Sequence, residues 1–156
     1  MENYTFPSII GTITVVYQGN IIDRLFIDAD ELSKNEPNPT ILKLKRQIDE
    51  YFEGKRLTFN IPFNIEGSTF KIDILNGILA IPLGKTMSYK ELAYKCGYPN
   101  AYRAVGTICK NNKLPIIIPC HRVIKSNGEL GEYVFGKHVK KALIDLEESY
   151  YINWLL

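Results

Sequence analysis

The feature that most constrains this 156-residue chain is the segment 115–123, an apolar run that ends at a proline and then presents a thiol beside an imidazole. Three consecutive isoleucines favour a short buried strand. Pro119, which has no N–H and a fixed φ, is expected to end that strand and to bend the chain before Cys120. A free cysteine is most often an inert core residue, but this one precedes His121 and Arg122, a base and a positive charge. The segment therefore predicts a reactive thiol at a rigid corner.

The chemistry of this corner depends on ionisation of the thiol. The thiolate is the nucleophile, and a free thiol with a pKa of about 8.5 is only slightly ionised at neutral pH. Adjacent side chains cannot easily hydrogen-bond to each other, so a proton relay from Cys120 to His121 is expected to need a water molecule. A third group should then orient the imidazole.

The string Ile-Pro-Cys-His-Arg-Val at 118–123, with Arg-Ala-Val-Gly at 103–106, resembles the active-site signature of the O6-alkylguanine-DNA alkyltransferases, the methylated-DNA–protein-cysteine methyltransferases. The resemblance is strong over residues 67–148 and weak before residue 51. It implies direct reversal of DNA damage by a single-turnover suicide protein. Cys120 attacks the alkyl carbon on O6 of guanine and keeps the alkyl group irreversibly, and no cofactor is needed.

The resemblance also implies a fold of the α/β (α+β) class with two domains. Residues 1–66 are expected to form a ribonuclease-H-like α/β domain. Residues 67–156 are expected to form a mainly helical DNA-binding and alkyltransferase domain that contains a helix-turn-helix.

Local patterns in the first half indicate a hairpin and a helix. β-branched residues at 11–17 and 21–27 flank a turn-forming Gln-Gly-Asn, which predicts two paired strands. A polar loop should follow over residues 28–39, and a further strand over residues 57–61. Thr40 is expected to cap the intervening helix. The residues expected on its buried face are Ile41, Leu44, Ile48, Tyr51 and Phe52.

Three more helices are expected between residue 67 and the cysteine segment. The first opens at residues 67–69 and ends before Pro82. Ser88 and Glu91 form a capping box that should start the second, which ends at Gly97. A third helix over residues 101–110 completes a helix-turn-helix. Helical hairpins of this length are mostly plain core packing, so only the neighbouring signature directs the interpretation toward DNA.

A last helix is expected to follow a polar turn after Ile124, with Val139, Leu143 and Leu146 facing inward and Glu147 near its end. The aromatic and apolar tail over residues 150–156 is expected to pack back onto the domain.

The resemblance implies five catalytic residues. Cys120 is the nucleophile and His121 is its base through a water. Glu147, which lies 27 positions after the cysteine, orients and charges the imidazole. Asn112 matches the hinge between the helix-turn-helix and the cysteine segment. Tyr89 matches the phenol that donates a proton to the departing guanine.

The implied partner is double-stranded DNA containing O6-alkylguanine, bound through the minor groove by a monomer. O6 of a stacked guanine cannot reach a buried thiol, so the base must flip out, at a cost of a few kcal/mol. Arg103 matches the arginine finger that takes the flipped base's place in the stack. The other residues implied to contact DNA are Ala101, Tyr102, Gly106, Ser88 and Arg122.

The residues implied to line the alkyl pocket are Cys109, Pro115, Val123, Tyr133 and Val134. The chain departs from the family here, because Val134 and Phe135 stand where small residues and glycine are usual. Phe135 either points into the core or faces the pocket. In the second case methyl groups should be accepted and bulky benzyl groups disfavoured.

Cysteine spacing and apolar pattern argue against a metal and a membrane. Cys96, Cys109 and Cys120 fit no metal-ligand spacing, and the family's zinc site, where it occurs, uses Cys and His in the first half, which has neither here. No signal peptide and no 18-residue apolar run is present, so the protein is expected to be cytoplasmic.

Charge divides unevenly along the chain. Residues 1–83 carry 8 Lys and Arg against 11 Asp and Glu, whereas residues 84–156 carry 11 against 6. A basic second half suits a polyanionic substrate, although a bias this small is often only a solvated surface.

Three other functional classes remain compatible with parts of the pattern. An alkyltransferase-like protein that binds lesions without repairing them usually lacks the cysteine. A Cys-His hydrolase would turn over many times and need an oxyanion hole. A transcription regulator would bind DNA without any chemistry.

Overall fold

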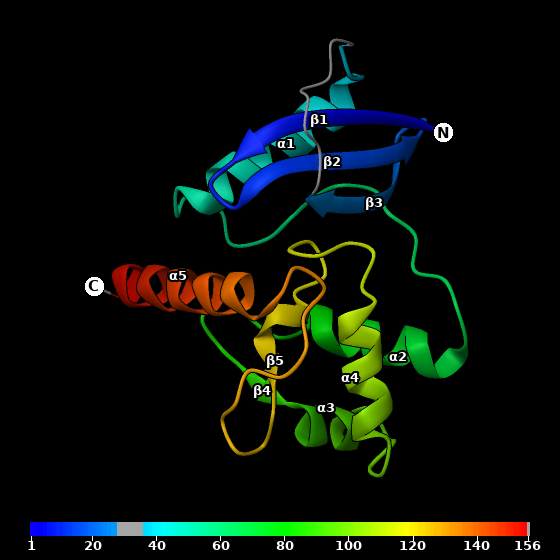
Figure 1. Cartoon of the computed structure of the whole chain (residues 1–156), viewed down its shortest axis with the longest axis vertical. Helices are drawn as coiled ribbons and strands as arrows, with labels where there is room; N and C mark the ends of the chain where they lie inside the picture. Colours follow the sequence, from blue (N-terminus) through cyan, green and yellow to red (C-terminus); the bar gives the residue numbers. More distant parts are fainter. Residues whose placement is uncertain (28–35, 156) are drawn as a thin grey trace. The chain divides into compact units, whose positions relative to one another are not determined.

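The computed structural model describes residues 1–27 and 36–155, and the chain divides into two compact units, Met1–Asn64 and Ile65–Leu156. The mixed α/β class is confirmed, with a sheet in the first unit and mainly helices in the second (Figure 1). Of the loop expected over residues 28–39, positions 28–35 lie outside the described residues.

The first unit contains a three-stranded antiparallel sheet in the order β1-β2-β3, formed by β1 (Glu2–Ser8), β2 (Gly11–Gln18) and β3 (Ile21–Ile27). The predicted hairpin is confirmed. β1 was not predicted, because Pro7 and its polar neighbours weaken the strand pattern. Pro7 is tolerated because β1 is an edge strand, where alternate N–H groups face away from the sheet and a missing one need not break a ladder hydrogen bond.

Helix α1 (Pro39–Phe52) packs along the sheet of the first unit (Figure 1). The predicted cap, Thr40, is wrong. Asn38 is the N-cap, and its Oδ1 accepts a hydrogen bond from the Ile41 N–H at 3.0 Å. Proline at the first helical position fits the start of a helix because its missing N–H would have no partner there. The predicted inner face is confirmed for Ile41, Leu44, Ile48 and Tyr51, and Phe52 is half-buried.

The strand predicted over residues 57–61 is wrong. Residues 57–61 form no ladder. Just after them, Phe63 makes an isolated bridge to Ile22. The buried side chain of Gln47 accepts the Asn60 N–H at 3.0 Å. A side chain from α1 therefore satisfies a backbone group that a strand partner would otherwise take.

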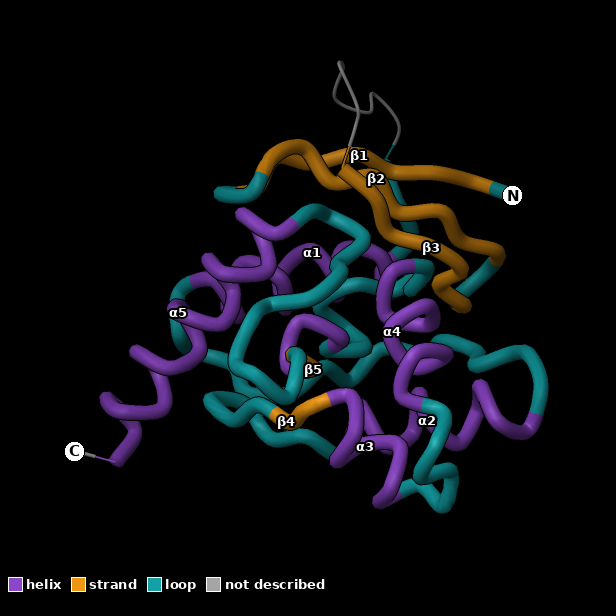
Figure 2. The backbone as a smooth tube through the Cα atoms, turned by 60° about the horizontal axis from the view of Figure 1, so that its bottom comes forward, coloured by secondary structure: helices purple, strands orange, loops and turns teal. Residues whose placement is uncertain are grey.

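The second unit is built from four helices and a small parallel sheet. The helices are α2 (Thr69–Leu79), α3 (Tyr89–Lys95), α4 (Tyr102–Lys110) and α5 (Lys137–Leu155), and the strands are β4 (Met87–Ser88) and β5 (Val123–Ile124). Helices α3 and α4 pack together as the predicted helix-turn-helix (Figure 2). The Ser88 Oγ accepts the Glu91 N–H at 3.0 Å, which confirms the cap.

The parallel pairing of β4 with β5 was not predicted. Each strand has only two residues, too few for a period to be visible in the sequence. The pairing matters for the site because β4 leads directly into α3, and β5 directly follows Cys120–Arg122.

Helix α5 continues through most of the expected tail. Tyr151 does pack back onto the unit: its ring lies over Lys85, with Nζ 4.5 Å from the ring centre. Within residues 1–27 and 36–155, no helix is both long and apolar enough to span a membrane.

Candidate active site

The segment before the cysteine is buried as predicted, but it is a tight turn and not a strand. Ile116 has a φ of 75°, and the Ile118 N–H bonds to the Leu114 carbonyl at 2.9 Å. Asn112 replaces the missing strand partner, because its amide donates to the Ile118 carbonyl at 2.9 Å and accepts the Leu114 N–H at 3.0 Å. A β-branched residue at positive φ is strained and persists only where its surroundings enforce it. The Asn112 amide supplies part of that enforcement.

Cys120 begins a short 3-10 helix, Cys120–Arg122, and its side chain is fully buried. Burial raises the pKa of the Cys120 thiol well above its usual value, and the neighbouring Cys109 thiol raises it further. The charge of Lys140 and a hydrogen bond from Asn112 act in the opposite direction. The resting residue is therefore a thiol, and its reaction requires a base.

The base His121 follows Cys120 in the chain and is paired with the carboxylate of Glu147. The His121 Nε2 lies 2.6 Å from the Glu147 Oε2, and both side chains are buried. Since Nε2 faces a carboxylate, it carries the proton, which leaves Nδ1 as the acceptor. Nδ1 is buried and has no partner among the described residues. Burial lowers the pKa of His121, partly opposed by Glu147, so the ring is neutral at pH 7 and able to take a proton.

Arg122 completes this cluster from the inside, so its predicted contact with DNA is wrong. Its Nε and Nη2 donate to the two oxygens of Glu147 at 2.7 and 3.0 Å, and Nη1 donates to the Ile81 carbonyl at 2.6 Å. A buried guanidinium must be paired, and each of the three nitrogens of this one donates a hydrogen bond inside the protein. Burial alone would raise the pKa of Glu147, but His121 and Arg122 outweigh it and lower that pKa to about 2.

Tyr89, at the start of α3, reaches toward the loop before α5. Its hydroxyl donates to the Glu132 carbonyl at 3.4 Å, and burial raises its pKa far above the ordinary value. The phenol therefore keeps its proton at neutral pH and can donate it. Gly131, at a φ of 76°, lies so close that any side chain there would overlap the Tyr89 ring.

Lys140 is a site residue that the sequence analysis missed. Its side chain is fully buried on α5, where Nζ donates to the Val123 carbonyl at 2.6 Å, the Glu132 carbonyl at 3.0 Å and the Tyr89 hydroxyl at 3.3 Å. Burial lowers its pKa to about 8. The spacing of Lys140, Leu143 and Glu147 at i, i+3 and i+7 puts all three on one helix face, a signal that could have identified it.

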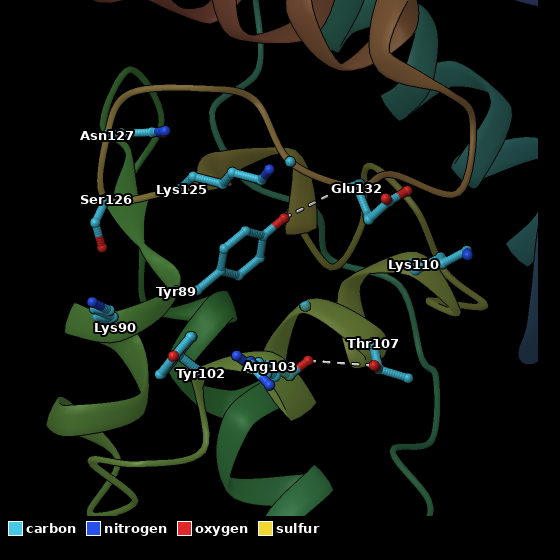
Figure 3. Close-up of a pocket in the computed structure, with 12 residues that line it drawn as sticks. Tyr89, Lys90, Tyr102, Arg103, Thr107, Lys110, Lys125, Ser126, Asn127 and Glu132 are labelled. Carbon is cyan, nitrogen blue, oxygen red and sulfur yellow. Dashed lines mark hydrogen bonds between the residues drawn. The ribbon is translucent and has the colours of Figure 1, made fainter.

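A pocket of about 560 Å³ opens beside Tyr89, and Figure 3 shows its lining. Arg103, Tyr102 and Gly106, three of the residues predicted to contact DNA, line its wall from α4. The remaining lining residues are Tyr89, Lys90, Thr107, Lys110, Lys125, Ser126, Asn127, Gly131 and Glu132. Four cationic side chains against one carboxylate make this an electropositive concavity.

The other predicted residues divide into buried and surface positions. Tyr133 is buried and its ring meets the His121 ring edge-on at 6.2 Å, whereas Val134 is 39% exposed. Ala101 is the residue just before α4, and the Ser88 hydroxyl is used as a cap. The remaining predicted pocket residues, all buried, are Cys109, Pro115 and Val123.

Comparison with known proteins agrees with this geometry. Residues 69–149 match the family model of the 6-O-methylguanine DNA methyltransferase DNA binding domain, and residues 3–65 match that of its ribonuclease-like domain. The chain belongs to this methyltransferase family. The family relationship predicted from two short strings is thus confirmed, and it extends over the first half, where the resemblance was weak.

Relatives and solved structures match most of the chain. The constitutive methylated-DNA–protein-cysteine methyltransferase of Bacillus subtilis is 33% identical over 152 residues, covering 91% of this chain and 92% of that protein. The Mycobacterium tuberculosis methyltransferase is 35% identical over 150 residues, 93% and 91% of the two chains. A crystal structure of Mycobacterium tuberculosis OGT in complex with DNA superposes with a TM-score of 0.84 at 35% identity, covering 95% of this chain and 93% of that one.

Proposed function

We propose that this chain is a methylated-DNA–[protein]-cysteine S-methyltransferase that repairs O6-alkylguanine in DNA by transferring the alkyl group to Cys120. The observation that carries the proposal is the buried row Cys120, His121, Glu147 and Arg122, beside an electropositive pocket. Glu147 holds both His121 and Arg122, and Cys120 is adjacent to His121 in the chain. A soft thiolate attacks saturated carbon well, and its thioether product is stable.

The reaction needs only residues of this chain. His121 takes the thiol proton on Nδ1 through a water, and the carboxylate of Glu147 stabilises the imidazolium that forms. The thiolate then attacks the alkyl carbon, the carbon–sulfur bond forms, and the bond from that carbon to O6 breaks with its electrons going to guanine. Tyr89 donates a proton to the departing guanine. The excess proton on His121 replaces the one that Tyr89 gave, by way of solvent.

Binding is proposed to place the lesion in reach of the thiol. As a monomer, the protein presents α4 to the minor groove, where readout is degenerate and suits a lesion in any sequence. The target base flips into the pocket and Arg103 fills its place. The three free cysteines fit a reducing cytoplasm.

The test is the intact mass of the protein after incubation with duplex DNA that contains O6-methylguanine. Wild-type protein should gain one methyl group, once, and Cys120→Ala should gain none while still binding the lesion. Cys96→Ala is the matched control and should gain one methyl group. It removes a half-buried thiol that donates a hydrogen bond to the Asp73 carbonyl. Methyl uptake by Cys120→Ala would assign the chemistry to another cysteine, and repeated turnover would indicate a hydrolase.

A further inference from the structure

One aromatic side chain beside the pocket has no role in the chemistry described above. Tyr102 is the first residue of α4, immediately before Arg103, and it is only partly buried at the pocket wall (Figure 3). Its ring lies 5.1 Å from the Lys90 ammonium and 6.0 Å from the Arg103 guanidinium, measured to the ring centre. Two cations thus share one ring.

The position of Tyr102 in the helix does not require an aromatic residue for packing. Tyr102, Val105 and Cys109 follow i, i+3, i+7 spacing, and the two later residues are fully buried. Tyr102 is at the open end of this row, where the helix leaves the core and meets the pocket. A core role would bury the ring, and it is not buried.

Arg103 has little else to hold it. Among the described residues its guanidinium forms no ion pair or hydrogen bond, and the Tyr102 ring is its one side-chain partner. A free arginine side chain loses rotamer entropy when it is placed in one orientation. A ring that attracts the guanidinium reduces the number of orientations before DNA arrives.

We propose that Tyr102 is a positioning residue that holds the Arg103 guanidinium at the pocket mouth, ready to enter the base stack. The proposal rests on the proposed function, because it assumes that Arg103 replaces a flipped base. Lys90 shares the ring and is left available for a DNA phosphate. The ring face acts through its quadrupole, so the hydroxyl is dispensable.

The experiment compares the single-turnover methyl transfer rate from a duplex with the rate from free O6-methylguanine base, because only the duplex requires flipping. Tyr102→Leu should lower the ratio of these rates about 2- to 5-fold, the factor expected for an exposed cation–π contact. Tyr102→Phe should restore the ratio. Tyr94→Leu, which changes a 75% exposed tyrosine on α3 outside the pocket lining, is the matched control and should keep the wild-type ratio.

A double-mutant cycle with Arg103→Ala decides how the ring acts. Arg103→Ala should strongly lower the ratio of the duplex rate to the free-base rate, and adding Tyr102→Leu should lower that ratio no further. The proposal would be overturned if Tyr102→Leu lowered the ratio by the same factor in the Arg103→Ala variant as in wild type, because the ring would then contact DNA independently of Arg103. Equal ratios for Tyr102→Leu and Tyr102→Phe would also overturn it. Wild-type protein that accepts no methyl group from duplex DNA would instead refute the proposed function itself.

Discussion

Glu147 lies at the centre of the buried cluster, where one carboxylate serves both an imidazole and a guanidinium. With neutral His121, the charges of Glu147 and Arg122 cancel. When the thiol proton moves to His121, a new cation and a new thiolate appear together and also cancel. The cluster therefore lets Cys120 ionise without changing the net charge of a dry interior.

Replacing Glu147 by glutamine should weaken this arrangement. A neutral amide no longer stabilises the imidazolium, so the apparent pKa of Cys120 should rise and the pH profile of its alkylation should move to higher pH. Reaction with a small alkylating reagent, followed by intact mass, measures the profile. An unmoved profile would remove Glu147 from the relay.

The free energy of unfolding of Glu147→Gln, compared with that of wild type, tests whether Glu147 is ionised in the folded protein. The pKa of Glu147 is lowered from its ordinary 4.5 to about 2, so its stabilisation is present above pH 4.5 and is lost as pH falls toward 2. Linkage makes this about 3 kcal/mol of unfolding free energy. Urea unfolding should show Glu147→Gln less stable than wild type at pH 6, with the gap closing near pH 2. A constant gap would mean that Glu147 is not ionised in the folded protein.

Lys140 offers a second test at the residue scale. Its positive charge favours the Cys120 thiolate, so Lys140→Met should raise the thiol pKa and slow alkylation at neutral pH several-fold. The difference from wild type should shrink above about pH 8, where Lys140 itself loses its proton. Lys141→Met removes the neighbouring, exposed lysine that pairs with Asp145 and is the control. Identical pH profiles of alkylation for both variants would show that the charge of Lys140 does not affect the Cys120 thiol.

At the scale of elements, the sequence predicts what is encoded locally. The hairpin, the helix start at residues 67–69 and the cap at Ser88 depend on neighbouring residues and were found. The β4–β5 pair and the 115–118 turn depend on partners far along the chain, and they were missed. Lys140 was missed because its hydrogen-bond partners lie on other elements, although its spacing on α5 places it on the inner helix face.

The loop between Gly131 and α5 contains Val134 and Phe135, where the resemblance implies small residues and glycine. The Phe135 ring packs edge-on against Tyr133 at 5.8 Å, and Tyr133 in turn contacts the His121 ring. Phe135 therefore supports the wall of the site through Tyr133. A supported wall yields less to a large alkyl group than a loop of small residues would.

This packing predicts that the wild-type protein reacts poorly with O6-benzylguanine and that Phe135→Gly raises that rate several-fold. Rates of benzyl transfer to Cys120 measure the effect. Val134→Gly adds the same backbone freedom without removing the ring, and its gain should be smaller. A wild-type rate equal to that of Phe135→Gly would show that the loop imposes no such restriction.

At the scale of the whole molecule, charge and chemistry share one part of the chain. The first 83 residues carry a net charge of −3 and the remainder +5, counted from 8 against 11 and 11 against 6. Lys90, Lys110, Lys125 and Arg103 of the basic part line one pocket, with Glu132 as the only acid. The small overall charge of +2 hides this division.

The cations around the pocket should make DNA binding depend on salt, because each phosphate contact releases condensed counterions. Lys125, in the turn after β5, is half-exposed and pairs only with the exposed Glu129, at 3.4 Å. Lys125→Gln should lower the affinity for damaged and undamaged duplexes alike and should reduce the slope of log affinity against log salt by about 1. Lys55→Gln removes an exposed charge, paired with Glu53, from the first unit and should leave the slope unchanged. Fluorescence anisotropy between low and physiological salt measures both slopes. Equal slopes for the two variants would show that Lys125 touches no phosphate, and the pocket's charge would then act on the flipped base alone.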